Sequence, residues 1–402
     1  MIYFIIILLF AFPVLFCDFK LWNYGESYAR GNIYQKYYYF LYAIVVLLFG
    51  LRNFVGGDTI GYMNMWSGLP TLDKLGVFDF INAKYAPMWY IFNAVCKSIN
   101  GEFWTFQIFH AIIVNAVIFY TISKYSNYRF TAILFFALSE LLYFNCEILR
   151  ESLSVSCGLL AFNYYVDKKW GKYYILALLA LSFHKSAVCL LFLPLIYNYT
   201  STKISNKQLA ILVVCGFVFS TFVLPYAVRV FMPFFADSFE GYSTMHRASI
   251  LGTLRSCLFV VLLTYLIKHY ETSDEHDIVI VGTKFYLLAQ VIGLFLPIFS
   301  TRFINYFLIY YIILLADFVW NHRGAHKLLV LALYANFLFG IVRQQTKDVS
   351  SWVSSTAHDY YFYEIYIPYY TIFEDIPTDV YLHRKAIYYQ ERLNDLKRNG
   401  EE

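Results

Sequence analysis

The chain has 402 residues, of which 60% are hydrophobic, 21% are aromatic and only 14% are charged. A water-soluble fold of this size could not cover its surface with so little charge, so the composition favours a lipid environment. The formal net charge of +4 is small and is scattered between apolar runs, which excludes a nucleic-acid groove and indicates membrane-topology signals instead.

Apolar runs recur along the chain. Their approximate bounds are 1–17, 37–51, 103–123, 130–149, 152–167, 172–197, 208–232, 255–269, 283–300, 303–320 and 327–342. A hydrocarbon core of about 30 Å is crossed by about 20 apolar residues in a helix. The sequence therefore predicts an all-α, polytopic integral membrane protein with about 11–13 transmembrane helices, some of them broken or re-entrant.

Lysine and arginine concentrate in short cytoplasmic loops, and this rule orients the predicted spans. Two segments then cannot be simple spans. Residues 81–100 lie between two outward positions, so we expect an interfacial or re-entrant segment. The run 172–197 has lysines of the cytoplasmic kind at both ends, which indicates two short half-helices with His184 and Lys185 at the outward apex. One long span with misleading lysines is the alternative.

The last part of the chain differs from the rest. Residues 1–342 are predicted to form one transmembrane catalytic domain, and residues 343–402 a tyrosine-rich tail outside the membrane. The tail contains YEIYIPYYTIFEDIP and a charged, helix-compatible stretch, 378–398. We expect the tail to pack across the outer mouth of the domain.

Four polar clusters interrupt the apolar runs, and all map to the outward side. An ionisable side chain at bilayer depth costs roughly 2.5–3.5 kcal/mol on insertion scales, so each one needs a partner or a function. The first cluster follows the second run. There Gly56 and Gly57 can bring backbone N–H groups and Asp58 close to a ligand beside Arg52. The alternative is a glycine turn whose arginine anchors to lipid headgroups.

The second cluster lies where two runs meet. At 100° per residue Glu147, Arg150, Glu151 and Ser154 fall within an arc of about 100° on one helix face. One positive charge and two carboxylates would then face one cavity. A structural ion pair that closes a helix junction is the alternative.

Two further clusters follow. His184 can exchange a proton near neutral pH, and Lys185 offers a compact positive charge for a phosphate. Arg302, Asn305 and Tyr306 are spaced i, i+3 and i+4, so one helix face would present a guanidinium, an amide and a phenol together. A structural histidine and a purely structural polar face are the alternatives.

Several familiar chemistries have no sequence signal here. There is no P-loop, nucleophile elbow or HExxH helix. His322 and His326 are four residues apart but have no third ligand, and the cysteines lack metal-ligand spacing. The sequence therefore predicts no cofactor and no metal site.

Four motifs in order carry a family resemblance. They are LRNFVGGDTIGYMNMW, NCEILRESLSVSCGLLAFNYYVDKKWGKYY, LALSFHKSAVCLLFLPLIY and STRFINYFLIYYIILL, with YIPYY of the tail as a fainter fifth. The chain resembles the Wzy-type polymerases of bacterial surface polysaccharide, in the EpsG-like branch, over about residues 40–320. The pair Gly56–Gly57 stands where a glycine and a small polar residue are usual.

The resemblance implies a GT-C-like, metal-independent glycosyltransferase in the bacterial inner membrane, multi-pass, with its active site facing the periplasm. Such an O-antigen or capsular polysaccharide polymerase moves a growing glycan from undecaprenyl diphosphate to the non-reducing end of a new lipid-linked repeat unit. Its partners would be undecaprenyl-diphosphate-linked oligosaccharides, membrane lipid and a polysaccharide chain-length regulator.

The clusters suit this chemistry. A diphosphate leaving group needs charge stabilisation, for which the candidate binding residues are Arg52, Arg150, Lys185, Arg302, Asn305 and Tyr306. An attacking sugar hydroxyl needs a base, for which the candidates are His184, Glu151 and Asp58. Glu151 or His184 is favoured as the base, and Asp58 as the carboxylate that orients the acceptor.

Other functions fit the same residues. A flippase or exporter of lipid-linked sugar would also need intramembrane arginines, but it should show internal repeats and charge on both sides of the membrane. An O-antigen ligase and a membrane acyltransferase also remain open. The sequence does not identify the sugars, the linkage or the oligomeric state.

Overall fold

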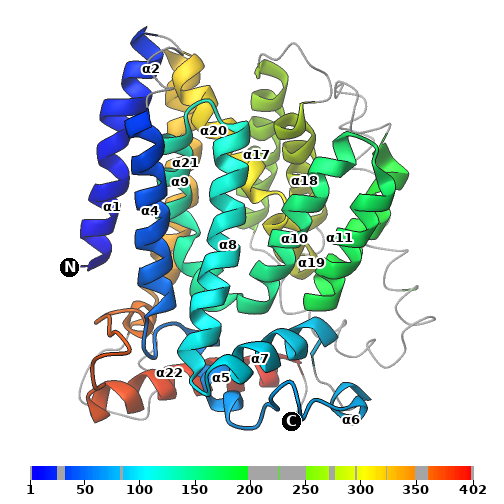
Figure 1. The fold of residues 1–402 in the computed structure, drawn as a ribbon. Coiled ribbons are helices and arrows are strands. Elements are labelled where there is room, and N and C mark those ends of the chain that lie inside the picture. Colours follow the sequence, from blue (N-terminus) through cyan, green and yellow to red (C-terminus); the bar gives the residue numbers. More distant parts are fainter. Residues whose placement is uncertain are drawn as a thin grey trace. The chain divides into compact units, whose positions relative to one another are not determined.

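The computed structural model describes residues 2–24, 32–81, 85–197, 226, 250–270, 277–294, 297–322, 324–348 and 361–399. These residues form α-helices joined by turns and by short π or 3-10 segments, with no β-strand among them (Figure 1). The all-α prediction is therefore confirmed. The predicted run 208–232 lies outside the described residues, apart from Tyr226.

The chain divides into two compact units. Unit 1 contains residues 1–191 and 315–389, and unit 2 contains residues 192–314 and 390–402. The helices of unit 1 are α1 (Ile2–Pro13), α2 (Phe19–Tyr24), α4 (Asn32–Gly50), α5 (Gly57–Trp66), α6 (Val77–Ile81), α7 (Pro87–Ile99), α8 (Phe103–Tyr125), α9 (Arg129–Ser139), α10 (Leu149–Val166), α11 (Trp170–Phe183), α12 (Val188–Phe192), α21 (Ala325–Gln345) and most of α22 (Thr378–Asn399). Unit 2 holds α17 (Ile250–His269), α18 (Ile278–Gly293), α19 (Pro297–Asn305) and the first half of α20 (Leu308–Asn321). The boundary predicted at residue 342 separates a transmembrane domain from a tail and does not coincide with the division into these two units. It stays a prediction.

Two described helical stretches are long and apolar enough to cross a membrane. They are Ile2–Asn23, which runs through α1, a π turn and α2, and the helix α8, Phe103–Tyr125. Shorter apolar helices of 10–17 residues among the described residues are Arg129–Ser139, Trp170–Phe183, Lys185–Ile196, Ile278–Gly293 and Leu308–Asn321. The larger predicted number, about 11–13 spans, stays a prediction.

The predicted run 130–149 is not one helix. α9 ends at Ser139, a π turn spans Tyr143–Glu147, and Ile148 leaves the helical region with φ −123° and ψ 46° before α10 begins. A buried amide pair lies at this break, where Asn115 Nδ2 donates to Asn145 Oδ1 at 2.8 Å. Such a break is tolerated where neighbouring protein satisfies the freed polar groups.

The break predicted at His184 is confirmed. α11 ends at Phe183, residues Lys185–Ala187 form a 3-10 turn, and α12 follows. The Tyr173 hydroxyl near the start of α11 donates to the Leu190 carbonyl in α12 at 2.5 Å. The chain therefore doubles back on itself, as two half-helices with His184 and Lys185 between them.

Three transverse helices cover one end of unit 1. α5, α7 and α22 run crosswise to α4 and α8 at the end where α4 finishes and α8 starts (Figure 1). α7 has the transverse orientation expected of an interfacial segment. At the opposite end lie the end of α8 and the start of α11, which carry the lysines that we predicted to be cytoplasmic (Figure 1).

The tail docks onto the segment between α4 and α5. Residues 51–53 pair with residues 370–372: Asn53 N–H donates to the Tyr370 carbonyl at 2.8 Å and Ile372 N–H donates to the Leu51 carbonyl at 2.9 Å. Farther on, Gly56 N–H donates to the Ile365 carbonyl at 3.1 Å. Main-chain hydrogen bonds thus hold the tail against the segment between α4 and α5.

Arg384 fastens the same junction from α22. Its guanidinium is fully buried, and each of its three nitrogens donates to a main-chain carbonyl. Nη1 binds Phe54 at 2.8 Å, Nε binds Glu364 at 3.1 Å, and Nη2 binds Pro368. Phe54 itself has a positive φ of 56° and stacks on Tyr381 of α22 with ring centroids 4.5 Å apart. One side chain therefore binds the backbone before α5 to the backbone of the tail.

The tail carries two further polar contacts. The backbone N–H and hydroxyl of Thr371 donate to the Glu374 carboxylate, which holds the pKa of Glu374 below its ordinary value. Burial lowers the pKa of His383, although the Glu364 carboxylate 2.8 Å from its Nε2 acts in the opposite direction.

Unit 2 is packed by small residues against aromatic rings. A Cβ at Gly282 of α18 would lie 2.4 Å from Cγ of Tyr310, so the two helices approach at a glycine. Tyr286 stacks on Tyr311 with centroids 4.5 Å apart, and Phe285 stacks on Phe307 at 5.0 Å. The core of this unit is thus aromatic.

Replacing Arg384 by Gln is expected to destabilise the protein, because buried carbonyls that lose their donor cost about 1–3 kcal/mol each. Thermal unfolding of the detergent-solubilised full chain should show Tm lowered by roughly 5–10 °C. Lys385→Gln is the matched control, since its ammonium lies only over the rings of Tyr381 and Tyr389. An unchanged Tm for Arg384→Gln would show that the three carbonyl bonds contribute little.

Candidate functional site

The start of α5 is built directly on the π turn of Cys146 and Glu147. Gly56 has φ +93°, and a Cβ there would lie 2.5 Å from Cβ of Cys146. Gly57 N–H donates to Glu147 Oε1 at 2.8 Å, so a carboxylate caps the positive end of α5. The glycine pair in the sequence is therefore required for close approach of two backbones.

The tail reaches the same carboxylate. The Tyr366 hydroxyl donates to Glu147 Oε1 at 2.7 Å. Glu147 thus joins α5, the π turn and the tail. The prediction that Glu147 shares a helix face with Arg150, Glu151 and Ser154 is wrong, because the chain leaves helical geometry at Ile148.

Arg52 has a structural role, because it is bonded within the protein. It is fully buried, Nε and Nη2 both donate to the Thr59 hydroxyl at 3.3 and 3.1 Å, and Nη1 donates to the Phe49 carbonyl. All three guanidinium nitrogens are therefore used within the protein. This geometry does not support the predicted role of Arg52 in binding the diphosphate.

Arg150 has a different environment. Its Nε donates to the Tyr62 hydroxyl at 2.5 Å, and its guanidinium carbon lies 4.1 Å from the ring centroid of Tyr85. Tyr62 and Tyr85 thus form an aromatic wall beside Arg150. Trp89 packs against it, with its ring centroid 4.7 Å from that of Tyr62. The side chain is partly exposed, and among the described residues no group binds its two terminal nitrogens. The two terminal nitrogens of a rigid fork are thus left for a ligand.

Asp58 lies on the same side of α5 as Tyr62. It stands in the first turn of the helix, one turn before Tyr62, and is partly exposed. Because Tyr62 binds Arg150, the structure brings Asp58 and Arg150 to one aromatic-walled region.

Glu151 and Ser154 of the same helix are buried, unlike Arg150. Glu151 is only 2% exposed, and the Ser154 hydroxyl donates to the Ala180 carbonyl of α11 at 2.7 Å. α10 packs along α11 and against the turn Lys185–Ala187. Ser154 therefore lies in the α10–α11 interface, and Glu151 is buried one turn before it on α10.

The histidine at the break has a defined hydrogen bond. His184 caps the 3-10 turn: Ser186 N–H donates to Nδ1 at 3.3 Å, and the Ser186 hydroxyl lies 2.7 Å from the same atom. Since Nδ1 accepts, the neutral ring carries its proton on Nε2. His184 is thereby set up as a donor at Nε2, and Lys185 beside it is exposed.

The fourth cluster lies in unit 2 and does not form the predicted face. α19 ends at Asn305, so Tyr306 already belongs to the following turn. Asn305 and Tyr306 are buried, whereas Arg302 is exposed. The prediction that the three side chains are presented together is therefore wrong, because the helix stops between them.

Sequence reasoning missed three residues of this region. His110 of α8 is fully buried, and its Nε2 lies 3.1 Å from the Leu149 carbonyl and 2.8 Å from the Ser152 hydroxyl, so it anchors the first turn of α10. Tyr366 and Arg384 of the tail were the other two. For His110 the sequence did offer a signal, a histidine within an apolar helix. Tyr366 and Arg384 offered none, since tyrosines and arginines are common in the tail.

The chain matches a known protein family. The family model described as "EpsG family" matches residues 35–376, which is most of the chain. No curated protein and no solved structure matches the chain. A GT-C-like fold accordingly stays a prediction.

Gly56→Ala is expected to destabilise the protein by at least about 2 kcal/mol, because the new Cβ meets Cys146 and an L-residue disfavours φ +93°. The measurement is Tm and yield of folded protein in detergent. Gly68→Ala is the control, since its Cβ would meet only the Met65 carbonyl at 3.7 Å. Equal Tm values for the two variants would rule out the close contact.

Proposed function

Because the chain belongs to the EpsG family of polysaccharide-biosynthesis membrane proteins, we propose that it polymerises lipid-linked repeat units. The growing glycan would move from undecaprenyl diphosphate to the non-reducing end of a new undecaprenyl-diphosphate-linked unit. The proposed site lies around Arg150, at the end of unit 1 that α5, α7 and α22 cover.

The observation that carries this proposal is the hydrogen bonding and exposure of Arg150. Its Nε is held by Tyr62 while its two terminal nitrogens have no partner among the described residues, and its side chain is partly exposed. A guanidinium fork of this kind matches two phosphate oxygens. Arg150 also stands in the first turn of α10, where the helix dipole favours an anion.

The reaction needs a group that stabilises the leaving diphosphate and a group that accepts a proton. The acceptor hydroxyl attacks the anomeric carbon, the bond from that carbon to the diphosphate oxygen breaks, and the hydroxyl proton passes to a base. Charge that develops on the diphosphate would be stabilised by Arg150 and by the Nε2 proton of His184.

Asp58 is the carboxylate best placed as that base. It is partly exposed and lies on the Arg150 side of α5, whereas Glu151 is buried. Glu151 is instead assigned to positioning α10 against the turn that carries His184 and Lys185. This ranking differs from the sequence-based one, which favoured Glu151 or His184.

Aromatic side chains beside Arg150 suit a sugar substrate. Tyr62, Tyr85, Tyr90 and Trp89 form a connected group, with Tyr85 and Tyr90 centroids 6.3 Å apart. Flat apolar rings bearing hydroxyls offer sugar rings both stacking surfaces and hydrogen bonds. The proposed acceptor would lie along this group.

Arg150→Lys is expected to lower polymerisation roughly 10²-fold, because a lysine keeps the charge but loses the fork. The assay is a gel of products formed by the purified full chain from one synthetic undecaprenyl-diphosphate repeat unit. A ladder of products indicates a polymerase, and a single product indicates a ligase. Arg129→Lys, an arginine stacked on Tyr38 and Phe130, is the control. Normal ladders from both variants would remove Arg150 from the mechanism.

Asp58→Asn should reduce the rate by about 10²–10⁴-fold and leave binding of the lipid-linked unit nearly unchanged, as expected for loss of a general base. Glu151→Gln should lower both, since it loosens the α10–α11 interface. Rate and affinity are measured separately for each variant. If Glu151→Gln alone shows a slow rate with normal binding, Glu151 is the base.

The proposal places the Arg150 end on the periplasmic side of the inner membrane. In a Cys257→Ser background, Phe373→Cys of the tail, whose side chain is 80% exposed, should react with an impermeant thiol reagent applied from the periplasmic side. Lys169→Cys, at the opposite end of unit 1, should not react. The reverse labelling pattern would invert the proposed orientation.

A further inference from the structure

The end of unit 1 opposite to Arg150 carries a group of lysines that the proposed reaction does not use. Lys124 lies in the last turn of α8. Lys168 and Lys169 lie in the turn between α10 and α11, and Lys172 lies in the first turn of α11. All four are exposed, and Asp167 is the one acidic residue in that turn. We name these four lysines, together with Tyr120, Tyr125, Asn163 and Tyr164, the basic patch.

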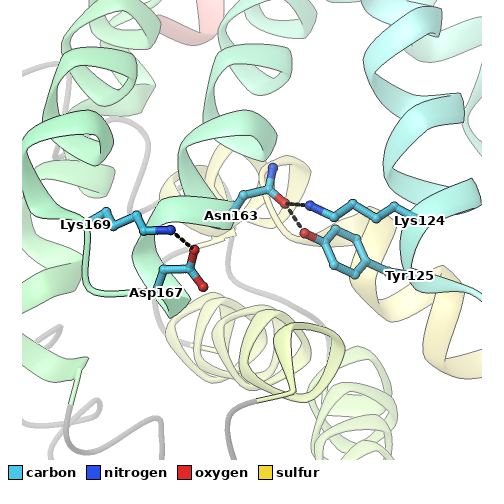
Figure 2. Close-up of polar contacts among 5 residues, drawn as sticks. All are labelled: Lys124, Tyr125, Asn163, Asp167 and Lys169. Carbon is cyan, nitrogen blue, oxygen red and sulfur yellow. Dashed lines mark hydrogen bonds and ion pairs between the residues drawn. The ribbon is translucent and has the colours of Figure 1, made fainter.

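Side-chain contacts connect the patch across three helices. Lys124 Nζ donates to Asn163 Oδ1 of α10 at 3.3 Å, and the Tyr125 hydroxyl donates to the same oxygen (Figure 2). The Lys124 ammonium also lies 5.5 Å from the ring centroid of Tyr120. Lys172 of α11 lies 5.5 Å from the ring centroid of Tyr164, the residue after Asn163. Two cations of the patch are thus held on tyrosine rings.

The turn between α10 and α11 adds to this arrangement. Lys168 has a positive φ of 56°, a conformation in which glycine is usual after a helix end. Bonds from Lys168 N–H to the Tyr165 carbonyl at 3.1 Å and from Lys169 N–H to the Tyr164 carbonyl at 2.9 Å hold it there. Lys169 is paired with Asp167 at 2.8 Å (Figure 2). Four positive charges against one negative charge leave the patch positive.

Exposed apolar surface continues from the patch along the helices. On α8, Phe109, Ile113 and Tyr120 lie on the same face as Lys124 and are 36%, 37% and 49% exposed. On α11, Ile175 and Leu178 follow Lys172 at intervals of three and are 69% and 54% exposed. α8 is also one of the two described stretches apolar enough to cross a membrane. An apolar stripe that ends in tyrosine and lysine has the chemistry of a bilayer boundary.

We propose that the basic patch binds an anionic phospholipid, with the headgroup phosphate at Lys124 and Lys172 and the acyl chains along the exposed stripes of α8 and α11. The positive charge complements a phosphate, and the apolar continuation selects a lipid over a soluble anion. Basic surfaces between transmembrane helices at the cytoplasmic side recognise such headgroups. The patch is separate from the proposed glycan site, so neither proposal depends on the other.

The test compares lipid retained by the purified full chain after reconstitution with equal amounts of phosphatidylglycerol and phosphatidylcholine. Native mass spectrometry identifies the bound lipid. Wild-type protein should retain phosphatidylglycerol preferentially. The double variant Lys124→Gln with Lys172→Gln should weaken that affinity about 30-fold. Each lysine near the surface strengthens the attraction of an anionic lipid about fivefold, and the two factors multiply.

The control is Lys36→Gln with Lys74→Gln, which removes two exposed lysines outside the patch and should leave retention unchanged. Equal Tm values confirm that both double variants fold. Equal retention of the two lipids by wild type, or equal loss from both double variants, would overturn the proposal. Displacement of phosphatidylglycerol by excess inorganic phosphate would also overturn it, since the patch would then be a site for free phosphate.

Discussion

The candidate site depends on one carboxylate that three distant segments share. Glu147 accepts the Gly57 N–H at the start of α5 and the Tyr366 hydroxyl from the tail, at 2.8 and 2.7 Å. A partly buried carboxylate is stabilised by donors of this kind, because an ionised group without them is costly to remove from water. The requirement brings α5 onto the π turn, and α5 carries Asp58 and Tyr62. Tyr62 in turn holds Nε of Arg150. The position of the proposed binding group therefore follows from how Glu147 is satisfied.

The tail belongs to this construction and is more than a cover. Arg384 binds carbonyls of Phe54, Glu364 and Pro368, and the strand-like pairing of residues 51–53 with 370–372 lies beside them. A Cβ at Gly61 of α5 would lie 2.2 Å from the Tyr388 hydroxyl of α22, so the two helices touch at a glycine. The segment before α5 is consequently held from both sides, by the π turn and by the tail.

Sequence reasoning found the parts of this fold that composition encodes. The helical class follows from the apolar runs, and the reversal at His184 follows from polar residues in the middle of a run with lysines at both ends. Local periodicity could not show the π turn, since one extra residue in a turn shifts every later side chain without changing the residue types. For that reason Glu147 was placed on the wrong face, and the same limit applies to Asn305 and Tyr306, where a helix end separates neighbours.

Arg384 was out of reach for another reason. Its partners are main-chain carbonyls, and one of them, Phe54, is 330 residues away in the chain. A carbonyl is present at every residue, so it leaves no pattern in the sequence. In a charged helix the arginine resembled its solvated neighbours, and only the fold reveals that it is fully buried.

The arginines can be separated by how many of their nitrogens the protein itself uses. In Arg52 and Arg384 all three nitrogens donate to protein oxygens and both side chains are fully buried, which is the arrangement of an architectural residue. Arg150 is partly exposed, and Tyr62 binds one of its nitrogens. A guanidinium has five N–H donors in a planar fork, so fixing Nε orients the remaining donors without consuming them. That combination reduces the entropy lost when a diphosphate binds, and it is the physical reason to assign the leaving group to Arg150.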